Sequence, residues 1–381
     1  MDRMRPQTPS SVVAVCAPNA FKGTLSAEAA AVAMARGVRD AGATAIEIPV
    51  ADGGDGTLDV LLAAQRSGSR VTRHRVTGPA GTSITARLGW LGRDEAVVEL
   101  AEASGLRRLG RAPRDALHAT SRGTGELIRI ALAAGARRVV VGVGGSASTD
   151  GGAGLLQGLG GHVLDSRGDE IGTGGAALEE AAGIDLSDVL KRFEHCEIVV
   201  ACDIRSPLLG ALGPGRMFSP QKGASASDVV RLERALAYFA VLASSLGYGD
   251  LSMLPGAGAA GGCGFGLALA GATLMPGAAL ICDMVGLDAA LGRATMAITG
   301  EGRLDSQTPT GKAPAEVAAR ARAHGIPSVA IAGTVLDRLP HLFSSTLSLA
   351  GIDRRIDPLR HARALLRTAA RRAVEAAPRP D

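Results

Sequence analysis

Aromatic residues, lysine and paired cysteines are all scarce in this chain of 381 residues. Phe, Trp and Tyr make up 2% of it, so its cores must be built from aliphatic side chains. Its five cysteines form no C-x-x-C pair, and the N-terminal MDRMRPQTPS lacks the apolar stretch of a signal peptide. We therefore expect reduced, buried thiols in a cytoplasmic protein, without structural zinc.

The chain also lacks the usual marks of nucleic-acid-binding and membrane proteins. Its net charge is +4, but 37 acidic residues are interspersed with the basic ones, and no basic run alternates with aromatic residues. The Arg-rich segment 354–379 is typical of an amphipathic helix with a solvated face. Residues 251–282 carry no charge, yet their glycines and prolines favour a loop followed by one buried helix over a membrane span. We expect no nucleic-acid or membrane partner, and a monomer or homodimer.

Glycine is abundant where lysine and aromatics are scarce. The chain has 52 glycines, nearly twice the usual share of about 7%. They cluster after apolar runs, as in the loop PNAFKGT after residues 11–17 and the loop ADGGDG after residues 46–50. Helical patterns follow both loops. Such loops lie at the carboxyl ends of buried strands, which is the edge of an open α/β sheet where ligands bind.

The same strand–loop–helix style returns near the C-terminus. The apolar run 294–298 leads into TGEGRLDSQTPTGK, and Pro314 suits the first turn of the next helix. The middle of the chain differs, with alternating strands over 71–101 and long glycine-dense stretches. We therefore predict an α/β protein with two α/β domains: residues 1–76 plus 290–381 form one, and residues 77–289 are inserted as the other.

Lysine is rare enough for its positions to be informative. Of 41 basic residues only four are lysines, and three of these, Lys22, Lys222 and Lys312, adjoin a glycine in a predicted loop. Lys191 is the exception. A compact ammonium beside permissive backbone suits the neutralisation of phosphate oxygens. We favour the interpretation that these three lysines contact a phosphate or another anion. The alternative is that they are ordinary surface lysines near turns.

Acidic residues show a parallel bias toward glycine-rich loops that follow apolar runs. They are Asp52 and Asp55 in ADGGDGT, Asp150 in SASTDGG, Asp203 in ACDIRSP, and Glu301 with Asp305 in TGEGRLDSQ. Converging on sheet edges, such acids would supply oxygen ligands for Mg²⁺ and a base for a hydroxyl nucleophile.

Two glycine-rich segments could approach phosphates. The segment 139–154, VVVGVGGSASTDGGAG, is typical of a cradle of backbone N–H groups before a helix, although the chain contains no Walker A motif. The segment 256–261, GAGAAG, matches G-x-G-x-x-G, but Pro255 stands where a strand should precede it. This isolated match is weak support for nicotinamide binding.

Taken in order, the motifs resemble those of the type 1 glycerate kinase family of bacteria. The matching segments are APNAFKGTLSA, PVADGGDGT, GVGGSASTDGGAG, VACDIRSPLLG, FSPQKGA, GAGAAGG and TGEGRLDSQTPTGKAP. The resemblance implies phosphorylation of D-glycerate with ATP and Mg²⁺, with 2-phosphoglycerate as the expected product and 3-phosphoglycerate as the alternative. It also implies a flavodoxin-like domain made by both chain ends, with a second α/β domain inserted. Asp55 stands where relatives usually have Glu, and Arg205 reverses a common charge beside Asp203.

The motifs and the resemblance together assign roles to the loop residues. As catalytic residues we predict Lys22, Asp52, Asp150, Asp203 and Asp305. Arg303, Lys312 and Lys222 are expected to bind substrate, with Asp150 and Asp203 as Mg²⁺ ligands. The predicted nucleotide cradle comprises Gly144, Gly145, Ser146, Gly151 and Gly152. Two other functions stay open: a nicotinamide dehydrogenase, resting on GAGAAG, and a nucleotide sensor that binds ATP without turnover.

Overall fold

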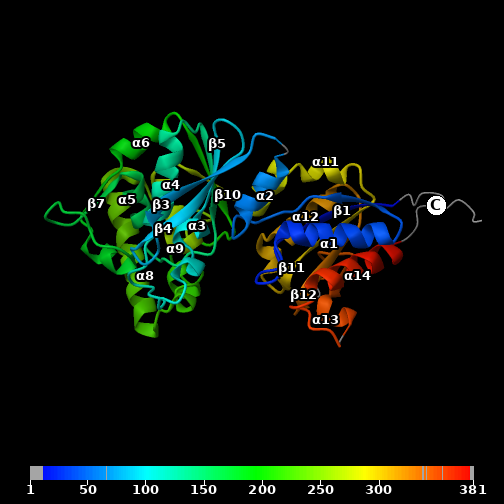
Figure 1. The fold of residues 1–381 in the computed structure, drawn as a ribbon. Helices are drawn as coiled ribbons and strands as arrows, with labels where there is room; N and C mark the ends of the chain where they lie inside the picture. Colours follow the sequence, from blue (N-terminus) through cyan, green and yellow to red (C-terminus); the bar gives the residue numbers. More distant parts are fainter. Residues whose placement is uncertain (1–11, 66, 337–338, 340, 354, 378–381) are drawn as a thin grey trace, which may run out of the picture. The chain divides into compact units, whose positions relative to one another are not determined.

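The computed structural model describes residues 12–377, apart from residues 66, 337–338, 340 and 354. The chain forms two compact units (Figure 1). Unit 1 combines the residues up to Ala51 with those from Cys282 onward, and unit 2 is Asp52–Ile281. The predicted limits were 76 and 290. The first of them cuts strand β3 (Arg70–Thr77), which pairs along its whole length with β4 (Ser83–Trp90) of unit 2.

Unit 1 is built on a parallel sheet of five strands contributed by both ends of the chain. The order is β13-β12-β11-β1-β2. The strands are β1 (Val13–Pro18), β2 (Thr44–Glu47), β11 (Met296–Leu304), β12 (Ser328–Val335) and β13 (Ser345–Ser348). Counted along the chain this is the 2-1-3-4-5 order of flavodoxin-like folds, so the fold-class prediction is confirmed.

The helices of unit 1 cover this sheet. They are α1 (Ala27–Asp40), α11 (Leu287–Leu291), α12 (Ala313–Ala323), α13 (Leu349–Ile352) and α14 (Ala362–Glu375). Ser26 caps α1 by accepting a hydrogen bond from the N–H of Ala29, and Pro314 occupies the first turn of α12, as predicted. Helices α1 and α14, from opposite ends of the chain, lie side by side (Figure 1).

Unit 2 is built on a mixed sheet of six strands in the order β10-β9-β6-β5-β4-β3. The parallel strands are β5 (Glu95–Glu99), β6 (Arg138–Val143), β9 (Glu197–Cys202) and β10 (Thr273–Pro276). The central strands β6 and β9 are apolar and buried at every residue after the first, as expected of parallel strands covered on both faces. The antiparallel edge strand β3 instead carries exposed arginines, which discourage pairing with another chain.

Helices of unit 2 surround the mixed sheet. A separate two-stranded antiparallel sheet is formed by β7 (His162–Leu164) and β8 (Gly183–Asp185). The helices are α2 (Thr57–Ala64), α3 (Leu100–Ser104), α4 (Arg122–Ala133), α5 (Ala153–Leu159), α6 (Ser187–Phe193), α7 (Pro214–Met217), α8 (Ala226–Ala243) and α9 (Ala259–Leu269). Helix α10 (Gly277–Met284) runs from unit 2 into unit 1. Ser225 and Asp228 form a capping box at the start of α8.

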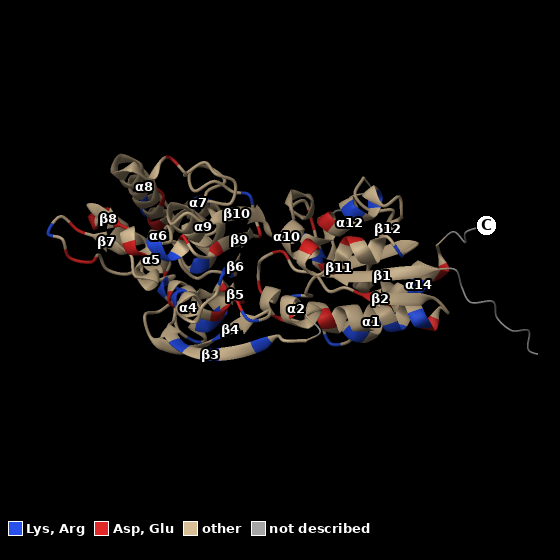
Figure 2. Ribbon diagram, turned by 90° about the horizontal axis from the view of Figure 1, so that it is seen from above, with Lys and Arg blue, Asp and Glu red and all other residues tan. Residues whose placement is uncertain are grey.

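The uncharged stretch 251–282 folds as turns, the buried helix α9, strand β10 and part of α10. In the described part of the chain no helix has both the length and the apolarity needed to cross a membrane. All five cysteines are buried and none forms a disulfide there. Basic and acidic residues are interspersed over both units (Figure 2).

Candidate active site

The loop 52–56 crosses the carboxyl ends of β6 and β9 at very short range. A Cβ atom on Gly53 would lie 2.2 Å from the carbonyl oxygen of Ala201, and Gly53 also has a φ of +95°. A Cβ atom on Gly144, which follows β6, would lie 2.5 Å from the Cα of Gly54. Only glycine fits at Gly53 and Gly144, so backbone contact at the strand ends explains the first glycine of ADGGDG and the glycine after β6.

Three acidic side chains surround this crossing. Asp52 Oδ1 accepts a hydrogen bond from the N–H of Gly54 at 3.3 Å. A Cβ atom on Gly144 would lie 3.1 Å from Asp203 Oδ2, and one on Gly145 would lie 3.0 Å from Asp55 Oδ1. The structure thus brings together four predicted site residues, Asp52, Gly144, Gly145 and Asp203, at one sheet edge. Asp55 is also there, paired with Arg107 at 3.0 Å.

Glu99 is a part of this edge that the sequence analysis missed. It is the last residue of β5 and is only 2% exposed. Its carboxylate accepts hydrogen bonds from the N–H groups of Gly56, at 3.1 Å, and Leu58, at 3.0 Å. Burial raises its pKa to about 7, although those two bonds oppose the shift. Glu99 therefore ties the loop 52–56 to the sheet. The sequence signal that could have identified Glu99 is an acidic residue at the end of an apolar strand.

Lys222 lies beneath the loop that follows β6. It is 3% exposed, and its ammonium donates hydrogen bonds to Ser146 Oγ, at 2.8 Å, and to the carbonyl oxygen of Ser148. Burial lowers its pKa to about 8. The structure therefore places Lys222 with Ser146 of the predicted cradle, where it supports the loop from inside. Its expected substrate contact stays a prediction.

Asp150 is also fully buried and faces inward. Its Oδ2 accepts hydrogen bonds from the N–H and the Oγ of Ser121, both at 2.8 Å, and burial raises its pKa. Gly152, two residues on, packs against α9, where its Cβ atom would lie 2.9 Å from the Cα of Gly266. Gly151 is buried in the same way. The roles predicted for these three residues in Mg²⁺ or nucleotide binding stay predictions, because their immediate partners are parts of the core.

A second group of predicted residues lies at the carboxyl edge of unit 1. In a sheet of this order the switch point falls between β1 and β11, where ligands bind. The N–H of Asn19 donates to the carbonyl oxygen of Gly300 at 2.8 Å, which ties the loop after β1 to β11. A Cβ atom on Gly302 would lie 3.4 Å from the backbone nitrogen of Lys22. The side chain of Lys22 is exposed at this edge.

The loop after β11 gathers the other predicted residues of unit 1. Asp305 pairs with Arg303 at 3.1 Å and with Lys312, the residue before α12, at 3.6 Å. Glu301, 8% exposed, accepts a hydrogen bond from Thr308 Oγ1 at 3.3 Å. The structure thus brings Arg303, Asp305 and Lys312 together, and two cations flanking one carboxylate can accept an additional anionic group. Their predicted roles stay predictions.

The segment GAGAAG does not have the surroundings of a dinucleotide-binding loop. Turns precede it, and its residues 256–260 are buried within unit 2. A dinucleotide-binding loop instead follows a strand directly and exposes its N–H groups to the pyrophosphate. The geometry supports the view that this match is weak.

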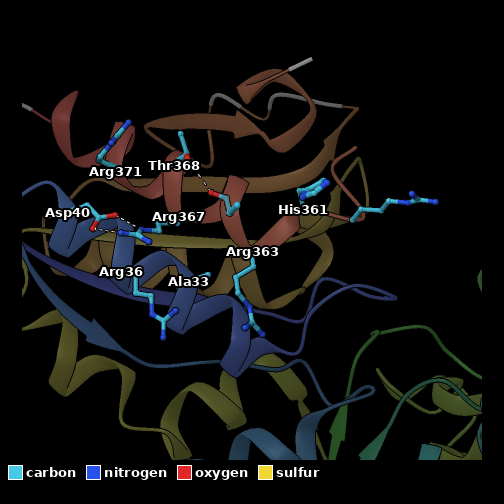
Figure 3. Close-up of a pocket in the computed structure, with 10 residues that line it drawn as sticks. Ala33, Arg36, Asp40, His361, Arg363, Arg367, Thr368 and Arg371 are labelled. Atoms are coloured by element: carbon cyan, nitrogen blue, oxygen red, sulfur yellow. Dashed lines mark hydrogen bonds and ion pairs between the residues drawn. The ribbon is translucent and has the colours of Figure 1, made fainter. Parts of the chain in front are cut away.

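A hollow of 740 Å³ between α1 and α14 is lined by several arginines (Figure 3). Arg367 pairs with Asp40 there at 2.5 Å, and Arg371 pairs with Glu375 at 3.5 Å. This hollow lies in the helical layer. Because arginine is the default cation of this chain and these two already have carboxylate partners, we place the candidate site at the strand ends.

A sequence model of the glycerate kinase family matches residues 14–377, which include most of both units. This chain belongs to the glycerate kinase family. Among its relatives, glycerate 2-kinase of Escherichia coli strain K12 is 42% identical over 85% of each chain. Glycerate kinase of Bacillus subtilis strain 168 is 43% identical over 84% of this chain and 85% of its own.

A solved structure of the same family supports the fold. The crystal structure of a protein assigned as glycerate kinase 2 from Salmonella typhimurium LT2 superposes with a TM-score of 0.80 at 40% identity. The superposition covers 96% of this chain and 97% of that one. The resemblance found in the motifs is therefore confirmed at the level of the whole chain.

The buried carboxylate of Glu99 predicts a pH dependence of stability. Because its pKa rises from 4.5 to about 7 on folding, its favourable contribution is complete below pH 4.5 and is lost as the pH rises to about 7. Gln keeps an oxygen acceptor without the charge. We expect Glu99→Gln to gain stability relative to the wild type between pH 5 and pH 8, measured by chemical denaturation at both pH values.

Glu102 is the matched control, three residues further along. Burial favours its neutral form, but hydrogen bonds and charge from Arg87 and Arg108 outweigh this and hold its pKa below the usual value. Glu102→Gln should therefore lose stability relative to the wild type at pH 8. Equal responses of the two variants to pH would contradict this assignment.

Proposed function

We propose that this member of the glycerate kinase family transfers a phosphoryl group from ATP to D-glycerate and releases 2-phosphoglycerate. The observation that carries the proposal is the family match through both units, with the family's loops at the carboxyl edges of two sheets. The relative from Escherichia coli, named a glycerate 2-kinase, favours the 2-phosphate over the 3-phosphate.

Phosphoryl transfer depends mainly on positioning and on neutralising charge. In unit 1, the exposed ammonium of Lys22 would neutralise phosphate oxygens, and Arg303 would grip the glycerate carboxylate with its guanidinium fork. Lys312 would add a second positive charge. Asp305, placed between Arg303 and Lys312, would orient both cations.

In unit 2, backbone N–H groups of the loop after β6 would hold the nucleotide phosphates. Gly145 is exposed on that loop, whereas Ser146 beneath it is held by Lys222. Asp52 and Asp203 are the candidates for the base that takes the hydroxyl proton. Asp150 would act through Ser121, by keeping the following turn in place.

The same edge suits Mg²⁺. Asp203 and Asp52 present hard oxygen donors on either side of the contact between Gly54 and Gly144, and Mg²⁺ favours one or two carboxylates plus substrate phosphates. Among the described residues, no group of three or more His, Cys, Asp or Glu side chains is arranged to hold a metal. When bound, Mg²⁺ would neutralise charge on the phosphate oxygens.

Two further parts of the proposal come from the composition and charge pattern. We place the protein in the cytoplasm, where ATP and glycerate would be its only binding partners apart from a second copy of the chain. No nucleic-acid or membrane partner belongs to the proposal.

The direct test is release of ADP in the presence of MgATP with D-glycerate, with L-glycerate and with no acceptor. We expect turnover with D-glycerate only, and a single phosphorylated product that phosphorus NMR assigns as the 2-phosphate. ADP release that does not depend on glycerate would overturn the proposed activity. A 3-phosphate product would overturn the regiochemistry alone.

Lys22→Ala should lower kcat/KM for glycerate by about 100-fold or more, because a lost electrostatic contact in the transition state typically costs this much. The side chain is exposed, so the melting temperature should stay unchanged. Lys191→Ala is the control, since Lys191 is an exposed lysine that pairs with Asp188 at 3.6 Å. Near-normal turnover by Lys22→Ala would remove this lysine from the mechanism.

Asp203→Asn should abolish turnover and weaken the Mg²⁺-dependent part of ADP binding, because Asn keeps the shape and loses the charge. Calorimetry with ADP, with and without Mg²⁺, measures the second effect separately. The control is Asp188→Asn, at an exposed aspartate of the same unit, which should change neither turnover nor the Mg²⁺-dependent binding of ADP. If Asp203→Asn binds MgADP as the wild type does, Asp203 is not a metal ligand.

A further inference from the structure

A largely apolar hollow opens beside Asp203, where β9 and β10 end. It has a volume of 340 Å³. The side chains that line it include those of Ile204, Arg205, Leu254, Pro255, Leu274 and Met275. Small-molecule pockets typically have volumes of about 300–1,000 Å³ and mostly apolar walls. The hollow has the size and the lining of a site for a compact ring system.

Its apolar walls are unusually exposed. Leu254 is 39% exposed, and Pro255 and Pro276, which also line the hollow, are exposed as well. Cys202 closes the inner wall; burial raises the pKa of its thiol to about 12, so this side chain is uncharged. Exposed apolar groups gathered beside a cluster of carboxylates mark a binding surface, because a solvated loop gains nothing from them.

The residues between the hollow and the glycine loop narrow the choice of ligand. Cys202 and Ile204 line the hollow, and Asp203 stands between them in the chain. Asp203 also lies next to Gly144, because a Cβ atom on Gly144 would be 3.1 Å from Asp203 Oδ2. A molecule with an apolar ring in the hollow would therefore carry its polar tail toward the carboxylates and the loop after β6. D-glycerate, which is small and fully polar, does not suit such walls.

We propose that this hollow binds the purine base of ATP. Aliphatic side chains and proline rings would contact the faces of the base, and the guanidinium of Arg205 at the rim can stack on its π system. The ribose and phosphates then extend past Asp203 to Gly144 and Gly145. The inference rests on the proposed kinase function for the identity of the ligand, but its geometry concerns unit 2 alone.

The test fills the hollow and measures binding without catalysis. Ala272 lines it and is half-buried, so Ala272→Phe would occupy the space of the base. By calorimetry we expect this variant to bind ADP at least tenfold more weakly than the wild type. The affinity of the variant for inorganic tripolyphosphate, which has no base, should equal that of the wild type. In turnover, KM for ATP should rise while KM for D-glycerate stays the same.

Ala133→Phe is the matched control. Ala133 is exposed and lines another hollow, which also contains Ala136 and Cys196, near the amino ends of β6 and β9. This variant should bind ADP as the wild type does. In case Ala272→Phe does not fold, Arg205→Ala, at an exposed position, should weaken ADP binding about two- to fivefold through loss of the cation–π contact.

The outcomes separate this inference from the proposed function. Unchanged ADP affinity in folded Ala272→Phe, or wild-type affinity for ADP no higher than for tripolyphosphate, would overturn the base site. ADP binding that is weakened in Ala272→Phe supports the base site even if no glycerate is phosphorylated. In that case only the proposed reaction fails.

Discussion

The close contact between two backbones at the carboxyl ends of β6 and β9 is the constraint on which the candidate site depends. Gly53 lies against Ala201, and Gly144 lies against Gly54, at distances that leave no room for a Cβ atom on Gly53 or Gly144. This contact carries Asp52 and Asp55 onto the sheet edge where Asp203 already lies. Any larger residue at these glycines would push the loop outward and separate the acids.

Buried charges hold this edge in place from below. Glu99 accepts from the backbone at the start of α2, Lys222 donates to the loop after β6, and Asp150 binds Ser121. Burying a charge is costly unless it is hydrogen-bonded, and each of these three groups has such partners. These hydrogen bonds fix the loops to the core, which suits a reaction that depends on placing phosphate oxygens accurately.

Local signals were sufficient to predict much of this molecule. Apolar runs followed by a lysine beside glycine located the loop after β1, and apolar runs followed by an acid located the loops after β6, β9 and β11. The split of these signals between the chain ends and the middle predicted an inserted domain. The predicted boundary at 76 cuts through β3, which pairs with β4 of the inserted unit, whereas the contact limit lies at 51.

Which charged residues face solvent was decided only by the tertiary structure. Lys22 and Lys222 have the same local signature, a lysine before glycine in a loop, yet Lys22 is exposed and Lys222 is buried against Ser146. Asp150 is fully buried, whereas Asp203 is partly exposed. The sequence alone determined the residue types, the strand-end loops and the family, because these depend on local conformation and pattern. Burial depends on segments that lie far apart in the chain, so the roles of Lys222, Asp150 and Glu99 emerged only when those segments packed together.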